Sequence, residues 1–358
     1  MNAALFLARP EIVALKPYAH AAWTPSLTRL HANEAPWRPA HDATAAGLNS
    51  YPEPQPQALV ERLAKLYGVP ASSVLATHGS DEAIDLLSRV YLRAGTDAIL
   101  QCTPTFGMYQ VAARIQGADV VEIPLDRAQG WALDPARLLA AWQPTMKLVY
   151  LCSPNNPTAN LLDAAAVEEI CAALDGKAIV VIDEAYVEWS RSPSHSRWLE
   201  RFSTLAILRT LSKAHALAGA RIGALLGHPD LIGLARRIIM PYSLAAPSVE
   251  AALRALEAPE LAAAHARIET LLAQREHLAR GLAASPLVER VWPSDANFLL
   301  IECRDADRFM SDALAGGVIV RDLRAHPSLQ RSLRVTVGTR AQNDTLLHCV
   351  GSGERAGD

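Results

Sequence analysis

From about residue 58 to residue 227, short apolar runs rich in β-branched residues alternate with amphipathic stretches of helical length. This alternation is typical of an α/β unit with a mostly parallel sheet, because each helix carries the chain back to the same end of the sheet. Seven strands are expected, at residues 73–77, 98–102, 119–123, 147–152, 178–183, 205–209 and 221–226. Open α/β sheets bind ligands beyond the carboxyl ends of their strands, so the residues that follow each strand are the first candidates for a site.

A second region begins near Tyr242. It contains an Ala-rich helical stretch from Ser248 to Ala284 and then strand-like segments at 288–292, 298–302, 318–321 and 333–337, which indicate a smaller α+β unit. The first 40 residues carry five prolines, which predicts an extended arm. We therefore expect an arm (1–40), a large domain (41–241), a small domain (242–350) and a C-terminal tail (351–358).

Composition narrows the class of protein. Half of the 358 residues are hydrophobic, 20% are charged, and no apolar run approaches the ~20 residues that a membrane span needs, so we expect a soluble chain without a membrane partner. The net charge of −3 lacks the basic excess typical of nucleic-acid binding. No basic start precedes the apolar N-terminal residues, unlike a secretory signal, which favours the cytoplasm. The five cysteines are widely spaced, which predicts free thiols and no metal site.

Polar residues follow two of the expected strands. Asp183 ends the run 178–183, and Tyr186 comes three residues later. Thr210, Ser212 and Lys213 follow the run 204–209, with Arg221 eight residues beyond Lys213. Taken singly, an Asp at a strand end is usually a turn or cap residue and a lysine usually lies on the surface. The glycine-rich nucleotide motifs, the zinc-protease motif and the serine-hydrolase motif are all missing from the sequence, so these side chains must serve another ligand.

Together these side chains match the needs of pyridoxal phosphate. The Lys213 amine can form a Schiff base, Asp183 can keep a pyridine nitrogen protonated, and Tyr186 can bond a ring oxygen. The phosphate would be met by hydroxyls and a cation, from Thr210, Ser212 and Arg221. His78-Gly79-Ser80-Asp81 opens a helical pattern whose first N–H groups favour an anion, although an ordinary N-cap is the alternative. Few amines compete with Lys213, since the other lysines are Lys16, Lys65, Lys147 and Lys177.

Five segments carry a family resemblance. They are Tyr51-Pro-Glu-Pro-Gln-Pro56, Ser153-Pro-Asn-Asn-Pro-Thr158, Asp183-Glu-Ala-Tyr186, Thr210-Leu-Ser-Lys213 and Leu333-Arg334-Val-Thr-Val-Gly-Thr339. In this order they resemble the histidinol-phosphate aminotransferases, a family of fold type I pyridoxal phosphate enzymes. The resemblance runs from about Pro17 to Thr339. The Asn, Asp, Tyr and Lys motifs are shared by many type I aminotransferases, whereas the Tyr51 segment and the two C-terminal arginines, Arg321 and Arg334, indicate this family.

The resemblance implies a role for each residue. Lys213 would carry the cofactor and move a proton, with Asp183 on the pyridine nitrogen and Tyr186 and Asn156 on the phenolic oxygen of the ring. Phe106 would cover one ring face and Ala185 the other. The residues implied around the phosphate are Gly79, Ser80, Asp81, Thr210, Ser212, Arg221 and Tyr51. Those implied for substrate binding are Tyr18, Tyr51, Asn156, Arg321 and Arg334.

The reaction implied by the resemblance is amino transfer between L-histidinol phosphate and 2-oxoglutarate in histidine biosynthesis, giving imidazole-acetol phosphate and L-glutamate. Both substrates are anions, which suit arginine because its planar fork pairs with phosphate or carboxylate. The resemblance also implies a homodimer with shared active sites, in which Tyr51 reaches the cofactor phosphate of the neighbouring subunit. The alternatives within the fold are a threonine-phosphate decarboxylase and a broad-specificity amino-acid aminotransferase. A cofactor-binding regulator is disfavoured, because the proline-rich arm has no room for a DNA-binding domain.

Three positions depart from the family pattern. Ala159 stands where a glycine is usual after Pro-Thr, which puts a turn with positive φ in question. His215 replaces an aromatic residue two positions after the lysine. Phe106 replaces a ring-stacking tyrosine and keeps its flat apolar face without the hydroxyl.

Overall fold

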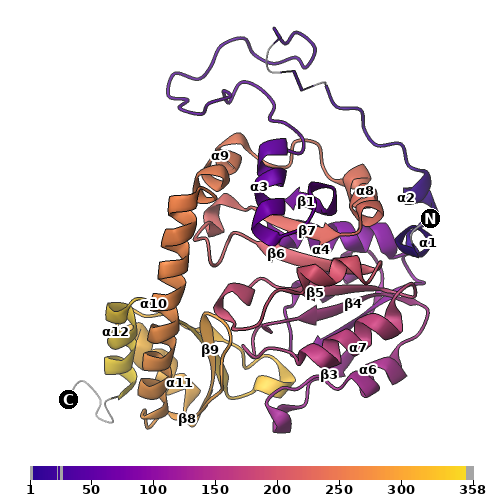
Figure 1. The fold of residues 1–358 in the computed structure, drawn as a ribbon. Coiled ribbons are helices and arrows are strands. Elements are labelled where there is room, and N and C mark those ends of the chain that lie inside the picture. The colour runs from indigo at the N-terminus through magenta and orange to yellow at the C-terminus, as the bar shows by residue number, and fades with distance from the viewer. Residues whose placement is uncertain (1–2, 22, 25–26, 352–358) are drawn as a thin grey trace.

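The computed structural model describes residues 3–21, 23–24 and 27–351, and its larger part is built on a seven-stranded sheet (Figure 1). The strand order is β1-β7-β6-β5-β4-β2-β3. The strands are β1 (Val74–Thr77), β2 (Ala98–Thr103), β3 (Asp119–Pro124), β4 (Met146–Cys152), β5 (Ile179–Asp183), β6 (Leu205–Thr210) and β7 (Gly223–Gly227). All seven expected strands are present, with boundaries that differ by one or two residues.

Strand direction explains where a ligand site can form. β7 runs antiparallel to both of its neighbours, β1 and β6, while the pairings among β2 to β6 are parallel. The carboxyl ends of β4, β5 and β6 therefore meet at one edge of the sheet, together with the end of β1 and the start of β7. Cys152, Asp183 and Thr210 are the last residues of the three parallel strands at this edge.

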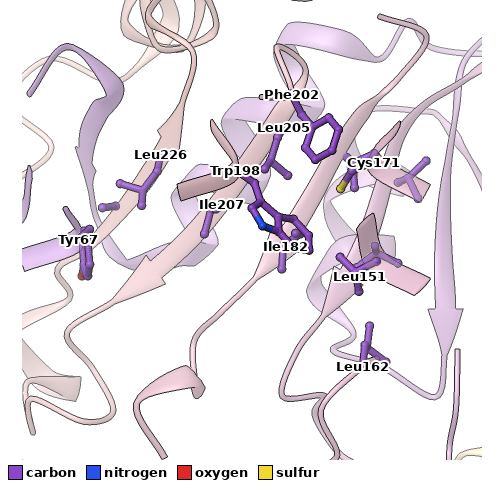
Figure 2. Close-up of a cluster of buried hydrophobic side chains, with 14 of the residues drawn as sticks. Tyr67, Leu151, Leu162, Cys171, Ile182, Trp198, Phe202, Leu205, Ile207 and Leu226 are labelled. Atoms are coloured by element: carbon purple, nitrogen blue, oxygen red, sulfur yellow. The ribbon is translucent and has the colours of Figure 1, made fainter. Parts of the chain in front are cut away.

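Both faces of the large sheet are buried, because successive side chains of each strand point to opposite faces. On β5, Val180 and Ile182 belong to one hydrophobic cluster, and Ile179 and Val181 belong to the other. Figure 2 shows part of the first cluster, where Ile182 and Ile207 of neighbouring strands lie near Trp198. The α-helices that contribute buried residues to the first cluster are α3 (Gln57–Tyr67), α6 (Pro135–Ala141), α7 (Ala164–Leu174) and α9 (Ala246–Ala255). Those that contribute to the second are α1 (Ala3–Leu7), α4 (Gly79–Tyr91), α5 (Met108–Ile115) and α8 (Pro229–Ile238).

The second unit is smaller and antiparallel. Its four strands have the order β10-β11-β9-β8. They are β8 (Val288–Val291), β9 (Phe298–Cys303), β10 (Arg321–Asp322) and β11 (Ser332–Thr336). The helices α10 (Ala258–Ala283), α11 (Ala306–Ala315) and α12 (Arg340–Gly351) pack with this sheet around a core of its own. The expected fold class, a seven-stranded mostly parallel sheet with a smaller α+β unit, is confirmed.

Three local expectations differ from the structure, and a fourth falls outside the described residues. The arm contains two short helices, α1 and α2 (Pro10–Ala14), because Pro10 occupies the first turn of α2, where its missing N–H costs no hydrogen bond. The stretch 248–284 is divided into α9 (Ala246–Ala255) and α10, with Pro259 in the first turn of α10. The strand expected at 318–321 is reduced to the two residues of β10, since only these pair with β11. The predicted tail beyond Gly351 lies outside the described residues.

Two of the predicted domain boundaries lie at the end of the arm, after residue 40, and at the start of the small domain, at residue 242. Residues 27–56 contain neither a helix nor a strand and form a long loop beside α3 and α9 (Figure 1), where the Ala45 N–H donates to Glu250 of α9 and the Gln55 side chain donates to the Ala76 carbonyl. α9 follows the predicted boundary at residue 242, yet its Val249 and Ala252 lie in the core against the large sheet. Among the described residues, none of the helices combines the length and the apolar character that a membrane crossing requires.

Candidate active site

A cavity opens at the edge where the parallel strands end. It is lined by Ser80, Asp81, Phe106, Cys152, Asn156, Asp183, Ala185, Tyr186, Thr210, Ser212, Lys213 and Arg221. Every lining residue except Cys152 is one that the sequence predicts for a cofactor site. These residues come from the first turn of α4 and from the loops that follow β2, β4, β5 and β6 and precede β7, so the topology of the sheet brings them together.

One end of the cavity is suited to an anion. α4 begins at Gly79, and the first N–H groups of a helix have no partner within the helix, so they favour negative charge. The Arg221 guanidinium lies beside this turn, where it donates to the Ser212 hydroxyl at 3.1 Å and pairs with the Asp81 carboxylate at 3.2 Å. Arg221 itself adopts a left-handed backbone conformation with a φ of 55°. Non-glycine residues hold such angles only where the surroundings impose them.

Two glycines make this close approach possible. Gly79 has a φ of 73°, and a Cβ on it would lie 2.4 Å from Nη2 of Arg221. A Cβ on Gly223 would lie 2.5 Å from the carbonyl carbon of Gly79 and 2.6 Å from the Ser80 nitrogen. Side chains at either position would therefore fill the space between α4, β7 and Arg221. The result is a cradle of N–H groups, hydroxyls and one guanidinium that fits a phosphate.

Asp183, the last residue of β5, also lines the cavity and is almost fully buried. Its Oδ1 accepts the Ala185 N–H at 3.0 Å, and its Oδ2 accepts the Tyr109 hydroxyl at 2.6 Å. Burial raises the pKa of Asp183 from 3.8 to about 6, although both hydrogen bonds oppose this change. At neutral pH the carboxylate is therefore mostly ionised and can pair with a protonated ring nitrogen.

Lys213, Tyr186 and Asn156 line the same cavity and lie near one another. The Lys213 ammonium is 5.7 Å from the centre of the Tyr186 ring, and the Asn156 amide donates to the Tyr186 hydroxyl at 3.4 Å. Partial loss of contact with water, followed by the charges of Arg334 and Arg221, lowers the pKa of Lys213 below its usual 10.5. Burial raises the pKa of Tyr186, which is therefore a neutral hydroxyl at physiological pH. A less basic amine is a better nucleophile and proton acceptor near neutral pH.

Arg334 and Arg321 do not line the cavity, but they approach it from the small unit. They are directly paired across β11 and β10, so both side chains emerge on the same face of the sheet. Arg334 donates to the side-chain oxygen of Asn156, which does line the cavity. Burial, together with the like charge of Arg321, lowers the pKa of Arg334. Like charges directly opposite each other on paired strands repel, and an anion bound between the two guanidinium groups would offset this repulsion.

Tyr51 and Tyr18 lie outside the cavity in this chain. Their side chains are 49% and 68% exposed. Tyr51 is nevertheless held in place, because the Glu34 carboxylate accepts its N–H at 2.8 Å and Arg29 donates to its carbonyl at 3.3 Å. Arg29 and Glu34 also form a buried ion pair with a separation of 2.6 Å. The Tyr51 ring stacks on Tyr242, with ring centres 4.6 Å apart.

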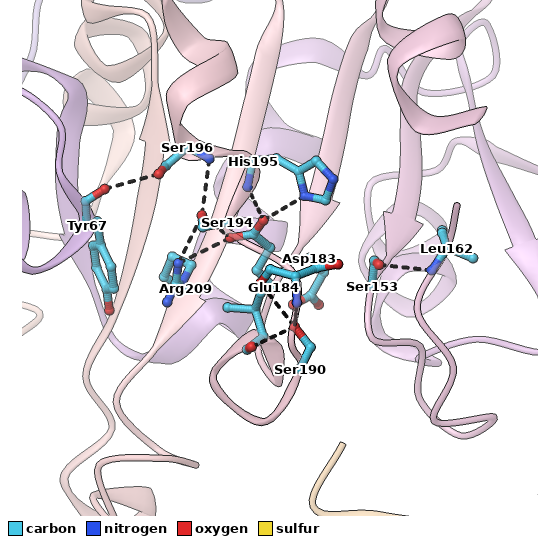
Figure 3. A network of polar contacts seen from close by, with 12 residues as sticks. Tyr67, Ser153, Leu162, Asp183, Glu184, Ser190, Ser194, His195, Ser196 and Arg209 are labelled. Carbon is cyan, nitrogen blue, oxygen red and sulfur yellow. Dashed lines mark hydrogen bonds and ion pairs between the residues drawn. The ribbon is translucent and has the colours of Figure 1, made fainter. Parts of the chain in front are cut away.

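Sequence reasoning missed a buried ionic network directly behind the site. Glu184 accepts hydrogen bonds from the His195 N–H, from Ser194 and from Arg209 (Figure 3). Arg209 also pairs with Glu188 at 2.7 Å. Burial alone would raise the pKa of Glu184, but the His195 hydrogen bond and the Arg209 charge outweigh it and lower the pKa. Glu184 follows Asp183 and Arg209 precedes Thr210, so the network fixes the two strand ends that carry site residues. Tyr109 was also missed, and its only local signal is its position three residues after Phe106.

The three departures from the family pattern have different outcomes. Ala159 does adopt the left-handed conformation, with a φ of 67°, and its carbonyl accepts the Asp295 N–H of the small unit at 2.7 Å. Phe106 lines the cavity, as predicted, and its ring edge contacts Tyr109. His215 does not line the cavity, and burial lowers its pKa. Within the described residues, no group of three or more His, Cys, Asp or Glu side chains could hold a metal ion.

Comparisons with known proteins agree with this geometry. The family model described as aminotransferase class I and II matches residues 29–350. The chain is 44% identical over 357 residues to a histidinol-phosphate aminotransferase of Stenotrophomonas maltophilia, with 98% of each chain covered. It is 45% identical over 355 residues to the enzyme of the same name from Xanthomonas campestris pv. campestris, again with 98% of each covered.

Solved structures share the fold at lower identity. The histidinol-phosphate aminotransferase of Clostridium acetobutylicum gives a TM-score of 0.76 at 19% identity, covering 84% of this chain and 90% of that one. The enzyme of the same name from Sinorhizobium meliloti, in complex with pyridoxal-5'-phosphate, gives a TM-score of 0.75 at 24% identity, covering 84% and 82%.

Proposed function

Because the chain belongs to the class I and II aminotransferase family, we propose that it transfers the amino group of L-histidinol phosphate to 2-oxoglutarate with pyridoxal 5'-phosphate as cofactor. The products are imidazole-acetol phosphate and L-glutamate, as in histidine biosynthesis. The two relatives that are 44% and 45% identical over nearly the whole chain bear the name of this activity.

One observation carries the choice of cofactor. Lys213, the buried carboxylate of Asp183 and the cradle beside Arg221 line a single cavity, so an amine, a ring-nitrogen partner and a phosphate site occur together. The missing Cβ atoms of Gly79 and Gly223 leave the cradle open for the phosphate. Phe106 and Ala185, which also line the cavity, provide apolar contacts for the two faces of a flat ring.

Different residues of this chain have different roles in the proposed reaction. Bound pyridoxal phosphate supplies a cationic ring that stabilises negative charge on the substrate carbon next to the amine. Asp183 keeps the ring nitrogen protonated, because the ionised carboxylate pairs with the N–H. With the cofactor and substrate bound, the Lys213 amine would take the proton from that carbon and serve as the general acid and base of the transfer. Asn156 and Tyr186 direct their polar groups towards the phenolic oxygen, and Tyr186 is neutral and therefore able to donate.

The arginine pair supports the choice of substrate. Histidinol phosphate presents a phosphate and 2-oxoglutarate presents carboxylates, and each can be bound bidentately by Arg334 with Arg321 beside it. Arg334 already contacts Asn156 at the rim of the cavity, so an anion bound there lies next to the reacting centre. Tyr18 and Tyr51 are proposed as further hydroxyl donors to the substrate.

We propose a homodimer with shared active sites to account for Tyr51. Within its own chain this residue does not reach the cavity, although its backbone is firmly held by Glu34 and Arg29. The arm also exposes large apolar side chains, with Leu30 91% and Trp37 81% exposed. Exposed apolar surface of this kind commonly marks a protein interface. A cytoplasmic location is proposed as well, and the five cysteines are free thiols, as is usual in a reducing compartment.

A substrate panel tests the activity against the alternatives within the fold. The purified enzyme with pyridoxal phosphate is given histidinol phosphate, histidinol, O-phosphothreonine and several amino acids, each with 2-oxoglutarate. Glutamate formation that is at least about tenfold more efficient with histidinol phosphate supports the proposal. Release of CO₂ from O-phosphothreonine would indicate the decarboxylase, and equal use of carboxylate-bearing amines would indicate a broad aminotransferase.

A further inference from the structure

Tyr109 reaches Asp183 from outside the cavity. It is completely buried in the first turn of α5, and its hydroxyl lies 2.6 Å from Oδ2 of Asp183. The ring is fixed on two sides, because it stacks on Tyr150 with ring centres 4.4 Å apart and meets the edge of Phe106 at 5.7 Å. Tyr109 is not among the residues that line the cavity, so it can act on a bound ligand only through Asp183.

The direction of this hydrogen bond is determined by charge. An ionised carboxylate can only accept, and burial raises the pKa of Tyr109 well above 10, so the tyrosine hydroxyl donates at physiological pH. The other oxygen, Oδ1, accepts the Ala185 N–H. Each carboxylate oxygen thus has one fixed protein donor, which sets the rotation of the group and leaves its remaining lone pairs for the cavity side.

We propose that Tyr109 is a positioning residue for Asp183, and that its hydroxyl keeps the carboxylate anionic and correctly rotated towards the ring nitrogen of the cofactor. This inference rests on the proposed function, because it assumes that Asp183 faces that nitrogen. The Asp183 carboxylate and the pyridine nitrogen share one proton. The hydrogen bond that Tyr109 donates to the carboxylate makes the carboxylate less basic. The shared proton is therefore held on the ring nitrogen, which keeps the ring cationic.

The other charged groups around Asp183 do not replace this donor. Asp81 and Glu184 are anions, and both oppose a second negative charge at Asp183. Lys213 is a cation across the cavity and already interacts with the Asp183 charge. The titratable groups that also interact with Asp183 from the packed elements include Cys152, Tyr150 and Tyr186, which are neutral thiol and hydroxyl groups. Tyr109 is therefore the neighbouring side chain that stabilises the ionised form by direct hydrogen bonding.

The test uses Tyr109→Phe with Tyr150→Phe as its matched control. Both substitutions remove one buried hydroxyl from the same ring stack, but Asp183 receives no hydrogen bond from Tyr150. In cofactor-free protein labelled with ¹³C at aspartate Cγ, the Asp183 resonance is assigned as the signal lost in Asp183→Asn and is followed against pH. Tyr109→Phe should raise the Asp183 midpoint by about one to two pH units, whereas Tyr150→Phe should leave it within about 0.3.

A second readout examines the loaded enzyme. Pyridoxal phosphate labelled with ¹⁵N in the ring reports by its chemical shift whether the ring nitrogen carries a proton. In the parent and in Tyr150→Phe the nitrogen should be protonated, and in Tyr109→Phe its shift should move towards that of neutral pyridine. A purely structural loss of packing would not move the proton in this direction.

The outcomes separate the two claims. An unchanged Asp183 midpoint in Tyr109→Phe, or an equal rise in both variants, overturns the role of Tyr109 whatever the enzyme's activity. Failure of the parent to bind pyridoxal phosphate overturns the proposed function, while the cofactor-free titration still decides the role of Tyr109. If Tyr109→Phe does not fold, 3-fluorotyrosine at position 109 keeps the ring and strengthens the donor, so the midpoint should fall. A midpoint that stays constant in that variant would contradict the proposal.

Discussion

Arg334 of the small unit donates a hydrogen bond to the side-chain oxygen of Asn156 in the large unit. The Asn156 amide in turn donates to the Tyr186 hydroxyl, so Arg334, which we propose to bind the substrate, is linked to the cavity through one side chain. An anion that binds the Arg334 guanidinium competes with the Asn156 oxygen for it. The hydrogen bond between Asn156 and Tyr186 can change as a result. On the proposed assignment, this short chain of contacts joins the substrate-binding residue to the cofactor site.

Arg334→Ala should damage both halves of the reaction, because both substrates present an anion to this residue. Loss of a bidentate charge-assisted contact lowers kcat/KM by about ten- to a hundredfold. Steady-state kinetics with histidinol phosphate and with glutamate measure the two halves separately. The control is Arg331→Ala, which removes an exposed arginine just before β11 that forms an ion pair with Glu289. An Arg334→Ala enzyme as efficient as the parent would show that the anion binds elsewhere.

Gly223→Ala should disrupt the phosphate cradle. The added methyl would lie 2.5 Å from backbone of Gly79, which cannot yield without moving the first turn of α4. We expect the dissociation constants of pyridoxal phosphate and of inorganic phosphate to rise by about tenfold or more, measured by titration of cofactor-free protein. Gly233→Ala is the control, since a Cβ there meets no atom within 4 Å. Parent-like affinity in Gly223→Ala would place the phosphate away from α4.

The Asp183→Asn enzyme should turn over slowly. When both proteins are free of cofactor, the variant should have a higher free energy of unfolding than the parent. Because burial raises the folded-state pKa from 3.8 to about 6, the ionised carboxylate costs stability above pH 6, up to about 3 kcal/mol. This cost disappears as the pH falls below about 4, where the group is protonated in both states. Urea unfolding at pH 8 and pH 4 measures the difference, and kcat should fall by several orders of magnitude. A variant that is less stable than the parent at pH 8, or has near-normal turnover, would identify Asp183 as a strand-end cap.

Mixing two defective chains tests whether Tyr51 serves the neighbouring subunit. A hybrid of Lys213→Ala and Tyr51→Phe chains has one site with both defects and one site with neither, if the tyrosine crosses the interface. Activity in the mixture should then exceed that of Tyr51→Phe alone. With subunit exchange verified by mass, activity no higher than that of Tyr51→Phe would put Tyr51 in its own subunit's site or in none.

The sequence predicts the large sheet well because its pattern is local. Buried strands such as β5 are continuous apolar runs that end at a polar residue, so both the strand and the place of Asp183 can be predicted. The strand expected at 318–321 was wrong because strand formation there depends on a neighbouring strand and not on the local pattern alone. Its apolar residues include Ile319, which is 88% exposed, and a strand needs a neighbour that the local pattern cannot supply.

Contacts between distant segments explain the other omissions. Tyr109 and Asp183 are 74 residues apart, and no spacing rule connects a helix start to the end of another strand. Glu184 and Arg209 likewise meet only because β5 and β6 are neighbours in the sheet. At Ala159 the surrounding contacts outweigh the conformational preference of the residue. Its N–H donates to the Asn155 carbonyl and its carbonyl accepts the Asp295 N–H, and these contacts hold it in the left-handed conformation that glycine usually takes.

The central claim is that Lys213 carries the cofactor at the carboxyl edge of the large sheet. Borohydride reduction of the loaded enzyme fixes pyridoxal phosphate on the amine that holds it, and peptide mapping by mass spectrometry then identifies the residue. We expect one cofactor per chain, on the peptide that contains Lys213. A label on Lys16, Lys65, Lys147 or Lys177, or no label in an enzyme that has bound the cofactor, would contradict the account.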